Sequence, residues 1–427
     1  MIDNERRARI ISLIKSEVVP AIGCTEPIAV ALCVAKASRM LGCEPERITA
    51  TLSANIIKNA MGVGIPGTGM TGLPIAIALG AICGKPELGL EVLRDVDSDA
   101  VGRGKAMVDA SRIFISLKDG IAEKLYIEIC CEAGGHKTVA IIAGGHTNFV
   151  YLSADNDVVL DQRLTDGDAA EDHTTDLTLE TVYEFATTTP LAELGFLLEA
   201  SKLNLAASRI SIEGNYGHAL GKILGGSHGS KMMGDTQFTH IVSLTAAACD
   251  ARMGGAIIPV MSNSGSGNQG ISATVPVVVY ARENGKSDDE MLRALALSHL
   301  TVIYIKQKLG RLSALCGCVV AATGSSCGLT LLMGGGYRQI CHAVKNMVGN
   351  LTGMICDGAK PSCALKVTSG VSTAVYAALM AMEDTSVSSL EGIVDEDVDR
   401  SIDNLTRIGL QGMAQTDREI LSIMLSK

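Results

Sequence analysis

The chain has 427 residues, and at roughly 150 residues per domain this length predicts two or three domains. Its net charge is −10, and only 3% of its residues are aromatic, with no Trp among them. Because this charge repels phosphate backbones and the chain offers few rings for base stacking, we expect no nucleic-acid partner.

Three stretches without charge, at residues 59–84, 253–280 and 312–337, are long enough to be considered as membrane spans. Each is interrupted by Gly, Pro, Ser or Asn, which favours buried loops over lipid-facing helices, so we expect no membrane partner. The first residues show no basic region followed by an apolar core, and the thirteen cysteines fit free thiols. These features predict a cytoplasmic protein without disulfides.

The N-terminal segment predicts two helices joined by a short loop. Residues 5–18 repeat isoleucine on one helical face. Thr25 is the expected N-cap of the second helix, which runs to about Met40 and ends at Gly42. Cys24 then lies just before the positive end of that helix, where a thiolate is stabilised.

Alternating apolar residues further along the chain predict a small antiparallel sheet. Residues 113–117 and 125–129 are expected to form a hairpin around a turn at residues 119–120. Residues 138–142 and 148–152 supply further strands, bounded by glycine pairs.

The fold class follows from the order of these patterns. The acidic segment 155–176 is expected to be a solvated loop, and helical periodicity dominates after a cap at Thr189. We therefore predict an α+β protein with two domains. Residues 1–210 form an α+β domain with a small antiparallel sheet, and residues 211–427 form an all-helical catalytic domain.

Cysteines in two glycine-rich segments are the most informative feature of the sequence. Cys356 and Cys363 stand seven residues apart across a Gly/Pro break, and Cys316 and Cys318 flank a glycine about forty residues earlier. Three thiols from two loops are what a cubane iron–sulfur cluster with one open iron requires. The alternative is that these cysteines are ordinary small buried residues.

A second group of residues lies in a segment rich in Ser, Gly and Asn. Ser264, Gly265, Ser266 and Asn268 offer hydroxyls and unobstructed backbone amides, which suit a carboxylate, and Arg252 could add a bidentate clamp. The alternative is close packing of two helices through the glycines.

A third group follows the second predicted helix. Asn55 and Lys58 form a polar cluster, and Gly67 and Thr68 belong to an amide-rich turn after it. Lys58 could act as a base or a charge partner, although a single lysine is more often solvated.

Other enzyme classes lose their support from the sequence. None of the eight histidines has a paired-ligand spacing, and neither a nucleophile elbow nor a P-loop occurs. The run SGNQG at 266–270 also looks like the phosphate-binding loop of pyridoxal-phosphate dehydratases. A cofactor-bearing lysine such as Lys231 is hard to place on a segment without alternating strands and helices.

Six sequence blocks in one order carry a resemblance to a known family. The blocks are AIGCTEP at 21–27, NIIKN at 55–59, IPGTG at 65–69, DARM at 250–253, GSGNQG at 265–270 and CDGAK at 356–360. Together they resemble the L-cysteine desulfidase family, which is related to the iron–sulfur L-serine dehydratases. The resemblance runs from about residue 15 to residue 415.

The resemblance implies a lyase that converts L-cysteine to hydrogen sulfide, pyruvate and ammonia with a [4Fe-4S] cluster and without pyridoxal phosphate. It implies Cys316, Cys356 and Cys363 as cluster ligands, with Cys318 in reserve for Cys316. The related serine dehydratases have a longer gap between the last two cluster cysteines and a further Cys near the C-terminus. This chain ends LSIMLSK, so Cys24 is expected either to ligate the fourth iron or to remove the Cα proton.

The substrate is expected to bind beside the cluster. The turn with Gly67 and Thr68, together with the Ser/Gly/Asn segment at 264–268, is expected to hold its carboxylate, and Asn55, Lys58 or Arg252 the remaining polar groups.

Two alternatives to a cysteine lyase remain at this stage. The substrate could be L-serine or another β-substituted amino acid, since a hydroxyl and a thiol differ by one atom. The protein could also bind a small amino acid without turning it over. Low aromatic content and glycine-rich helices permit a homodimer.

Overall fold

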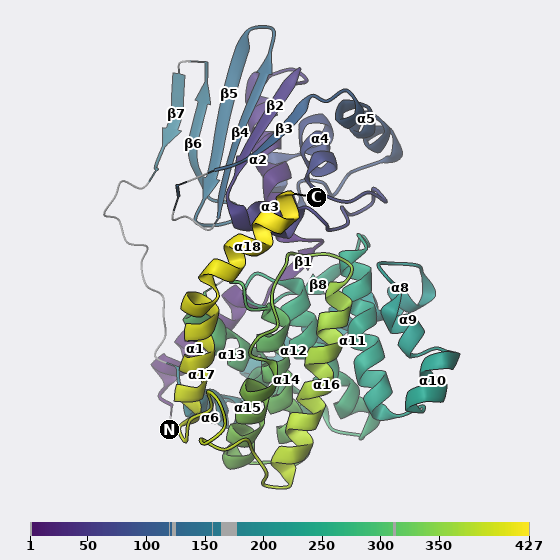
Figure 1. The fold of residues 1–427 in the computed structure, drawn as a ribbon, viewed down its shortest axis with the longest axis vertical. Coiled ribbons are helices and arrows are strands. Elements are labelled where there is room, and N and C mark those ends of the chain that lie inside the picture. Colours follow the sequence, from purple (N-terminus) through teal and green to yellow (C-terminus); the bar gives the residue numbers. More distant parts are fainter. Residues whose placement is uncertain are drawn as a thin grey trace.

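The chain folds into two layers that meet across a broad junction (Figure 1). The computed structural model describes residues 2–118, 120–121, 125–155, 157–163, 177–310 and 313–426. We call residues 25–163 the sheet layer, and residues 4–22 together with 177–412 the helical layer. The predicted α+β class is confirmed.

A six-stranded sheet forms the outer part of the sheet layer. Its strands are β2 (Arg47–Leu52), β3 (Ile113–Leu117), β4 (Tyr126–Ala133), β5 (His136–Ala143), β6 (Phe149–Ala154) and β7 (Asp157–Asp161). The spatial order is β3-β2-β4-β5-β6-β7, and β2 and β3 are parallel while the other neighbours are antiparallel.

The predicted hairpin between residues 113–117 and 125–129 is wrong, because β2 lies between β3 and β4. Strand β2 alternates between more and less buried residues, and it pairs with β3 along one edge and with β4 along the other. Because β2 is far from both strands in sequence, the local pattern could not reveal its place between them. Asp119, in the predicted turn, lies outside the described residues.

The acidic segment is not entirely a loop, because Asp157–Asp161 forms the edge strand β7. Val158 and Val159 are exposed there, at 56% and 67%, so the strand has a charged, twisted edge rather than a buried face. Residues 164–176 lie outside the described part of the chain.

Helices cover one face of the sheet (Figure 1). They are α2 (Thr25–Leu41), α3 (Ala54–Ala60), α4 (Leu73–Cys83) and α5 (Ser98–Asp109), with a 3-10 turn at Pro86–Glu91. Helix α2 packs on β4, β5 and α4. It ends at Gly42 as predicted, with φ of +77°, but its N-cap is Cys24 rather than Thr25.

The helical layer contains most of the remaining elements. They are α1 (Asn4–Glu17), α6 (Leu179–Thr188), α7 (Leu191–Leu194), α8 (Leu198–Glu213), α9 (Leu220–Leu224), α10 (Ser227–Met233), α11 (Gln237–Met253), α12 (Gly267–Glu283), α13 (Asp288–Leu309), α14 (Gly317–Leu332), α15 (Tyr337–Leu351), α16 (Cys363–Met382) and α17 (Val398–Arg407). Thr189 is the C-cap of α6 rather than a helix start. The core helices α12 and α13 are buried along nearly their whole length.

The N-terminal segment packs within the helical layer, whereas the C-terminal helix reaches the sheet layer. Strand β1 (Pro20–Ile22) pairs antiparallel with β8 (Pro259–Met261), and Ile10 and Ile14 of α1 join the core of the helical layer. After a π-turn at Ile408–Gly412, helix α18 (Ala414–Leu425) leaves the helical layer and contacts α3 (Figure 1). The proposed division at residue 210 stays a prediction.

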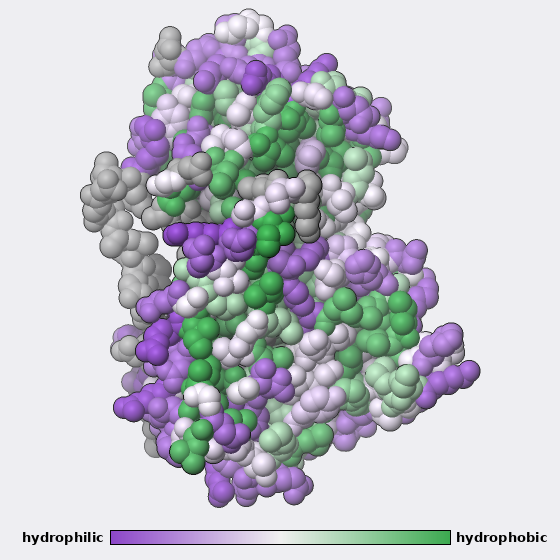
Figure 2. Space-filling model, in the orientation of Figure 1, coloured by the Kyte–Doolittle hydropathy of each residue, from purple (hydrophilic) through white to green (hydrophobic). Residues whose placement is uncertain are grey.

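One helix among the described residues, α16, is long and apolar enough to cross a membrane by length and composition. It is not one of the three uncharged stretches discussed above. Of its apolar window 56% is buried, and it packs on α14, α15 and α11. In the space-filling view, hydrophobic residues also follow α18, while polar residues cover both ends of the molecule (Figure 2).

The contact between α2 and α4 predicts an asymmetric response to two Gly→Ala substitutions. A Cβ added at Gly80 would lie 2.5 Å from the carbonyl oxygen of Ala31, whereas one at Gly102 in α5 meets nothing within 4 Å. We expect Gly80→Ala to lower the free energy of unfolding by about 1–3 kcal/mol. Gly102→Ala should raise it by roughly 0.5–1 kcal/mol. Urea unfolding checks both, and equal effects would contradict the close helix contact.

Candidate active site

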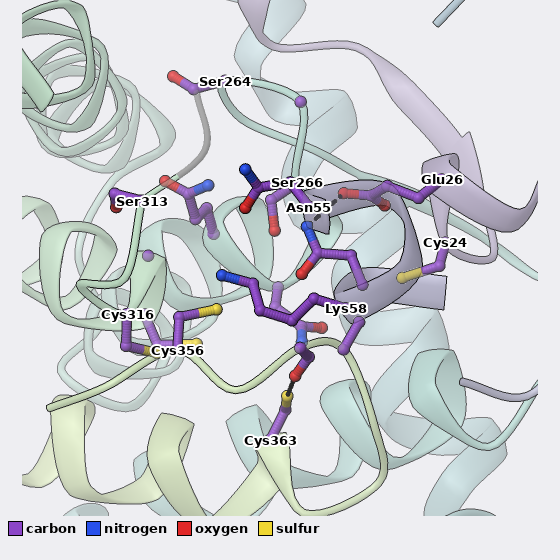
Figure 3. A pocket seen from close by; sticks show the side chains of 18 of the residues that line it. Cys24, Glu26, Asn55, Lys58, Ser264, Ser266, Ser313, Cys316, Cys356 and Cys363 are labelled. Carbon is purple, nitrogen blue, oxygen red and sulfur yellow. Dashed lines mark hydrogen bonds between the residues drawn. The ribbon is translucent and has the colours of Figure 1, made fainter. Parts of the chain in front are cut away.

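A cavity of about 290 Å³ lies where the two layers meet (Figure 3). Its walls come from the start of α2, from α3, and from the loops before α12, α14 and α16. The side chains with polar or sulfur atoms that line it are Cys24, Glu26, Asn55, Lys58, Asn59, His146, Arg252, Ser264, Ser266, Asn268, Gln269, Lys306, Ser313, Cys316, Cys318, Cys356 and Cys363. Gly265 contributes backbone.

Backbone pairing brings two of the predicted cluster cysteines together. The amide of Cys316 donates to Met354 O at 2.9 Å, and the amide of Cys356 donates to Ala314 O at 2.7 Å. Between them Leu315 and Ile355 form an isolated antiparallel bridge. Two thiols that are forty residues apart in sequence therefore sit on adjoining strands of backbone.

The loop that follows Cys356 leads to the third thiol. Cys363 begins α16, and its thiol donates to Gly358 O at 3.6 Å. Gly358 has φ of +91°, and a Cβ there would lie 2.0 Å from Lys58 O, so this position needs glycine. The loop is thus packed directly on α3.

Two lysines and a carboxylate brace the same loop. Lys366 donates to Ile355 O at 2.8 Å, Lys360 donates to Asp357 O at 2.7 Å, and both lysines pair with the Asp357 carboxylate. Burial opposes ionisation of Asp357, but hydrogen bonds from Lys360 and Lys366 hold its pKa at about 2. The carboxylate therefore keeps both ammonium groups beside the thiol-bearing loop.

Burial raises the thiol pKa values in this cavity. It raises the pKa of Cys363 to about 11, and it raises that of Cys356 against the opposing charges of Lys58 and Lys366. A hydrogen bond to Cys316 and burial raise the pKa of Cys318. Without a bound cation these thiols stay protonated at neutral pH, and a thiophilic cation would stabilise their thiolates.

Arg252 connects Cys24 to the loop before α12. Its guanidinium donates to Cys24 Sγ at 3.4 Å, to Gly23 O at 3.2 Å and to Asn268 Oδ1 at 3.1 Å. Burial raises the pKa of Cys24 to about 12, and Arg252 opposes this shift. Arg252 thus has three protein partners. The sequence had predicted only that it binds the substrate.

The loop before α12 is held from below by a buried network. Ser264 donates to Asn263 Oδ1 at 2.8 Å, and Asn263 Nδ2 lies 3.0 Å from Nδ1 of His299. The other ring nitrogen of His299 lies 3.0 Å from Thr274 Oγ1. Ser266 is the N-cap of α12 and has no side-chain cap bond, so its hydroxyl leaves the first amides of this helix uncapped, next to the cavity that Ser266 and Asn268 line.

Helix α3 supplies Asn55 and Lys58, both of them buried. The Lys58 side chain extends toward the side of the cavity where Cys316 and Cys356 lie, opposite Cys24 (Figure 3). Its ammonium pairs with Asp417 of α18.

Two amide oxygens in the cavity have no hydrogen-bond partner in the described structure. They are Oδ1 of Asn55, which is 8% exposed, and Oε1 of Gln269, which is 4% exposed. Because buried polar groups are almost always satisfied, these two atoms indicate that the cavity receives a polar ligand.

The turn with Gly67 and Thr68 does not line the cavity. The Thr68 hydroxyl donates to Ile65 O at 2.8 Å and accepts from the Met70 amide at 2.9 Å. A Cβ at Gly67 would meet Ile257, so the turn is closed on itself. Lys231, the lysine of the pyridoxal-phosphate alternative, lies on α10 and does not line the cavity either.

Several cavity residues were not singled out from the sequence. Glu26 accepts from Asn59 Nδ2 at 3.1 Å, and both residues lie inside blocks that the resemblance already contained. Gln269 lies in the GSGNQG block. Asp417 carried no sequence signal, because its partner Lys58 is 359 residues away.

The donor set of the cavity fits a cluster. Cys316, Cys356 and Cys363 line one cavity, and the charges of Lys58 and Lys366 act on Cys356. A cubane cluster with one open iron takes three thiolate ligands, the number that these cysteines can supply. Among the residues that the structure describes, no group of three His, Cys, Asp or Glu side chains is arranged to hold a single metal ion.

The sequence profile of the serine dehydratase alpha chain family matches residues 87–422. The chain belongs to the serine dehydratase alpha chain family. The matched segment contains the three thiols and Arg252, while Cys24, Asn55 and Lys58 precede it. Membership of the serine dehydratase family points to a lyase-type enzyme and supports that part of the resemblance.

Full-length relatives of this serine dehydratase family protein carry the name UPF0597. The present chain is 66% identical over 427 residues to a UPF0597 protein from Bacteroides fragilis, with both chains covered in full. It is 65% identical over 427 residues to one from Bacteroides thetaiotaomicron, covering 99% of that relative. A relative from Oleidesulfovibrio alaskensis is 47% identical over 423 residues, with 98% of each chain covered.

The buried network under the α12 loop predicts a pH dependence of stability. Burial lowers the pKa of His299 from 6.5 to about 4. Protonation then favours the unfolded chain, so stability should be constant above pH 6.5 and fall as pH drops from 6.5 toward 4. His299→Gln should reduce this fall, measured by urea unfolding at several pH values. His228→Gln, at an exposed position on α10, is the control and should leave the fall unchanged.

Proposed function

We propose that this protein is a β-elimination lyase that acts on a small amino acid with the help of a [4Fe-4S] cluster. The preferred substrate is L-cysteine, giving hydrogen sulfide, pyruvate and ammonia. The observation that carries the proposal is the convergence of Cys316, Cys356 and Cys363 on one cavity that also contains Cys24. Membership of the serine dehydratase family supports the lyase chemistry.

In this proposal Cys316, Cys356 and Cys363 hold the cluster, with Cys318 in reserve for Cys316. When bound, a cluster with one open iron supplies a Lewis acid that assists departure of the β-substituent. The positive charges of Lys58 and Lys366 near Cys356 support a net negative group at this position.

The residues of the chain would bind and orient the amino acid. The first amides of α12, with Ser264, Gly265, Ser266 and Asn268 around them, suit the carboxylate. The unpartnered oxygens of Asn55 and Gln269 suit the ammonium group. Arg252 is not free to serve the substrate only, because it also holds Cys24 and Asn268 in place. These roles give the carboxylate and the ammonium separate sites.

Cys24 is our choice for the group that takes the Cα proton. Burial raises the pKa of its thiol to about 12, so this role requires that Arg252 and the start of α2 hold Cys24 as a thiolate in the loaded site. Lys58 is placed to stabilise negative charge that develops on the substrate. The alternative role for Cys24, as a ligand of the fourth iron, predicts a different outcome on substitution, described below.

L-Serine is the second candidate substrate, and the family match favours it specifically. The pyridoxal-phosphate alternative loses the lysine named for it, because Lys231 does not line the cavity. A binding protein without turnover would retain substrate affinity and form no pyruvate. The predictions of a cytoplasmic location and a homodimer are kept as parts of this proposal.

Cysteine substitutions test the cluster directly. Anaerobically purified protein should contain about four iron and four sulfide per chain. Cys356→Ala and Cys363→Ala should remove most of both, while Cys327→Ala, at a buried position that does not line the cavity, should retain them. Metal and acid-labile sulfide analysis measures this. A Cys363→Ala protein with full iron content would contradict the ligand assignment.

Cys24→Ala separates the two roles of Cys24 in the same assay. As a proton acceptor, Cys24 can be removed without loss of the cluster, but turnover should fall about 10²–10⁴-fold. As an iron ligand, its removal should change the cluster spectrum in the absence of substrate.

Substrate choice is tested by a side-by-side comparison. Pyruvate formation from L-cysteine and L-serine is measured on the same cluster-loaded sample, with sulfide as the second product for cysteine. We expect a higher kcat/KM for L-cysteine. A higher value for L-serine would reassign the substrate within the same mechanism, and no pyruvate from either would contradict the proposed function.

A further inference from the structure

A buried ion pair connects the cavity to the last helix of the chain. Lys58 is 2% exposed, and its ammonium pairs with the Asp417 carboxylate, whose side chain is 27% exposed. A buried ammonium group is costly unless a partner of opposite charge and hydrogen bonds compensate it. Asp417 supplies that compensation from α18, an element at the opposite end of the sequence.

Apolar contacts hold the helix that carries Asp417. Ile420 and Leu421 on the same helix are buried, and Leu421 packs into the core of the sheet layer. Helix α18 contacts α3 and follows the π-turn that ends α17. The carboxylate is therefore held against α3 by apolar contacts that do not involve Lys58.

Other groups in the cavity can attract the Lys58 ammonium. Glu26 lines the same cavity, and the Lys58 side chain extends toward the wall that carries Cys316 and Cys356 (Figure 3). Without a fixed counter-charge, a flexible lysine side chain can move toward any of these groups. The carboxylate of Asp417 restricts the ammonium to one place in the cavity wall.

We propose that Asp417 is a positioning residue for the elimination reaction, which fixes the Lys58 ammonium in the cavity and makes α18 part of the active site. The inference rests on the proposed function. It assigns to the C-terminal helix a role in turnover that is exerted through Lys58 and not through contact with the substrate.

A double-mutant cycle tests this role. Asp417→Asn should lower kcat about 10- to 100-fold, because the ammonium is misplaced, while KM changes little. Asp417→Glu should recover part of the rate. In a Lys58→Met background, Asp417→Asn should cause no further loss, since the group it positions is already absent. Glu419→Gln, an exposed acid on the same helix, is the matched control and should behave like the wild type.

Amine labelling gives a readout that does not depend on turnover. An acylating reagent should modify Lys58 several-fold faster in Asp417→Asn than in the wild type or in Glu419→Gln, as measured by mass spectrometry of the peptide. Thermal unfolding confirms that each variant is folded.

The outcomes separate this inference from the proposed function. An active wild type whose Asp417→Asn variant keeps full kcat, or loses rate multiplicatively with Lys58→Met, overturns the inference and leaves the proposed function intact. A wild type that forms no pyruvate contradicts the proposed function. In that case the labelling experiment alone tests whether Asp417 restrains the Lys58 ammonium. Unchanged labelling of Lys58 in Asp417→Asn would overturn the restraint.

Discussion

The short antiparallel contact between Leu315 and Ile355 is the constraint on which the site depends. It fixes the register of two loops that are forty residues apart, so that Cys316 and Cys356 project from neighbouring backbone. Gly358 then lets the second loop pack against the carbonyl of Lys58, which no residue with a Cβ permits. The thiols, α3 and the cavity between the layers are therefore positioned by one local piece of backbone geometry.

Charge compensation is the second requirement of this junction. Lys58, Lys360 and Lys366 lie near the thiols, and Asp357 and Asp417 balance them from outside the cavity. On the other wall, Arg252 donates hydrogen bonds to Gly23 O and Asn268 Oδ1, which connect the segment of Cys24 to the start of α12. The arrangement leaves a cavity lined by protonated thiols and cationic groups, which suits an anionic cluster and an amino-acid zwitterion.

Local sequence patterns predicted the fold class, the first two helices and the strands β4, β5 and β6. They failed where pairing is non-local. Strand β2 separates β3 from β4, and no turn or periodicity near residues 113–129 could reveal an insertion from residues 47–52. Strand β7 was missed because its acidic residues resemble a solvated loop, although three apolar residues, 158–160, lie between Asp157 and Asp161.

The site shows the same limit. Motif blocks located Cys24, Asn55, Lys58 and Cys356 because each block is continuous in sequence. Cys316 and Cys363 were found in glycine-rich segments outside these blocks, and the fold brings all six residues to one cavity. Gly67 and Thr68 were predicted to bind substrate because their turn is amide-rich, but the Thr68 hydroxyl and amide bond within the turn, and the Gly67 amide donates to Gly255 O. Asp417 could not be predicted, since a single acid on an amphipathic helix carries no indication of a partner at residue 58.

The most direct test of the central claim is a Mössbauer spectrum of anaerobically prepared, ⁵⁷Fe-enriched protein, recorded without and with L-cysteine or L-serine. Three thiolate ligands and one open iron predict a cubane signal in which about one quarter of the iron changes its parameters when the amino acid binds. Protein without iron, or a cluster whose iron sites all remain unchanged by both amino acids while pyruvate is released, would contradict the account.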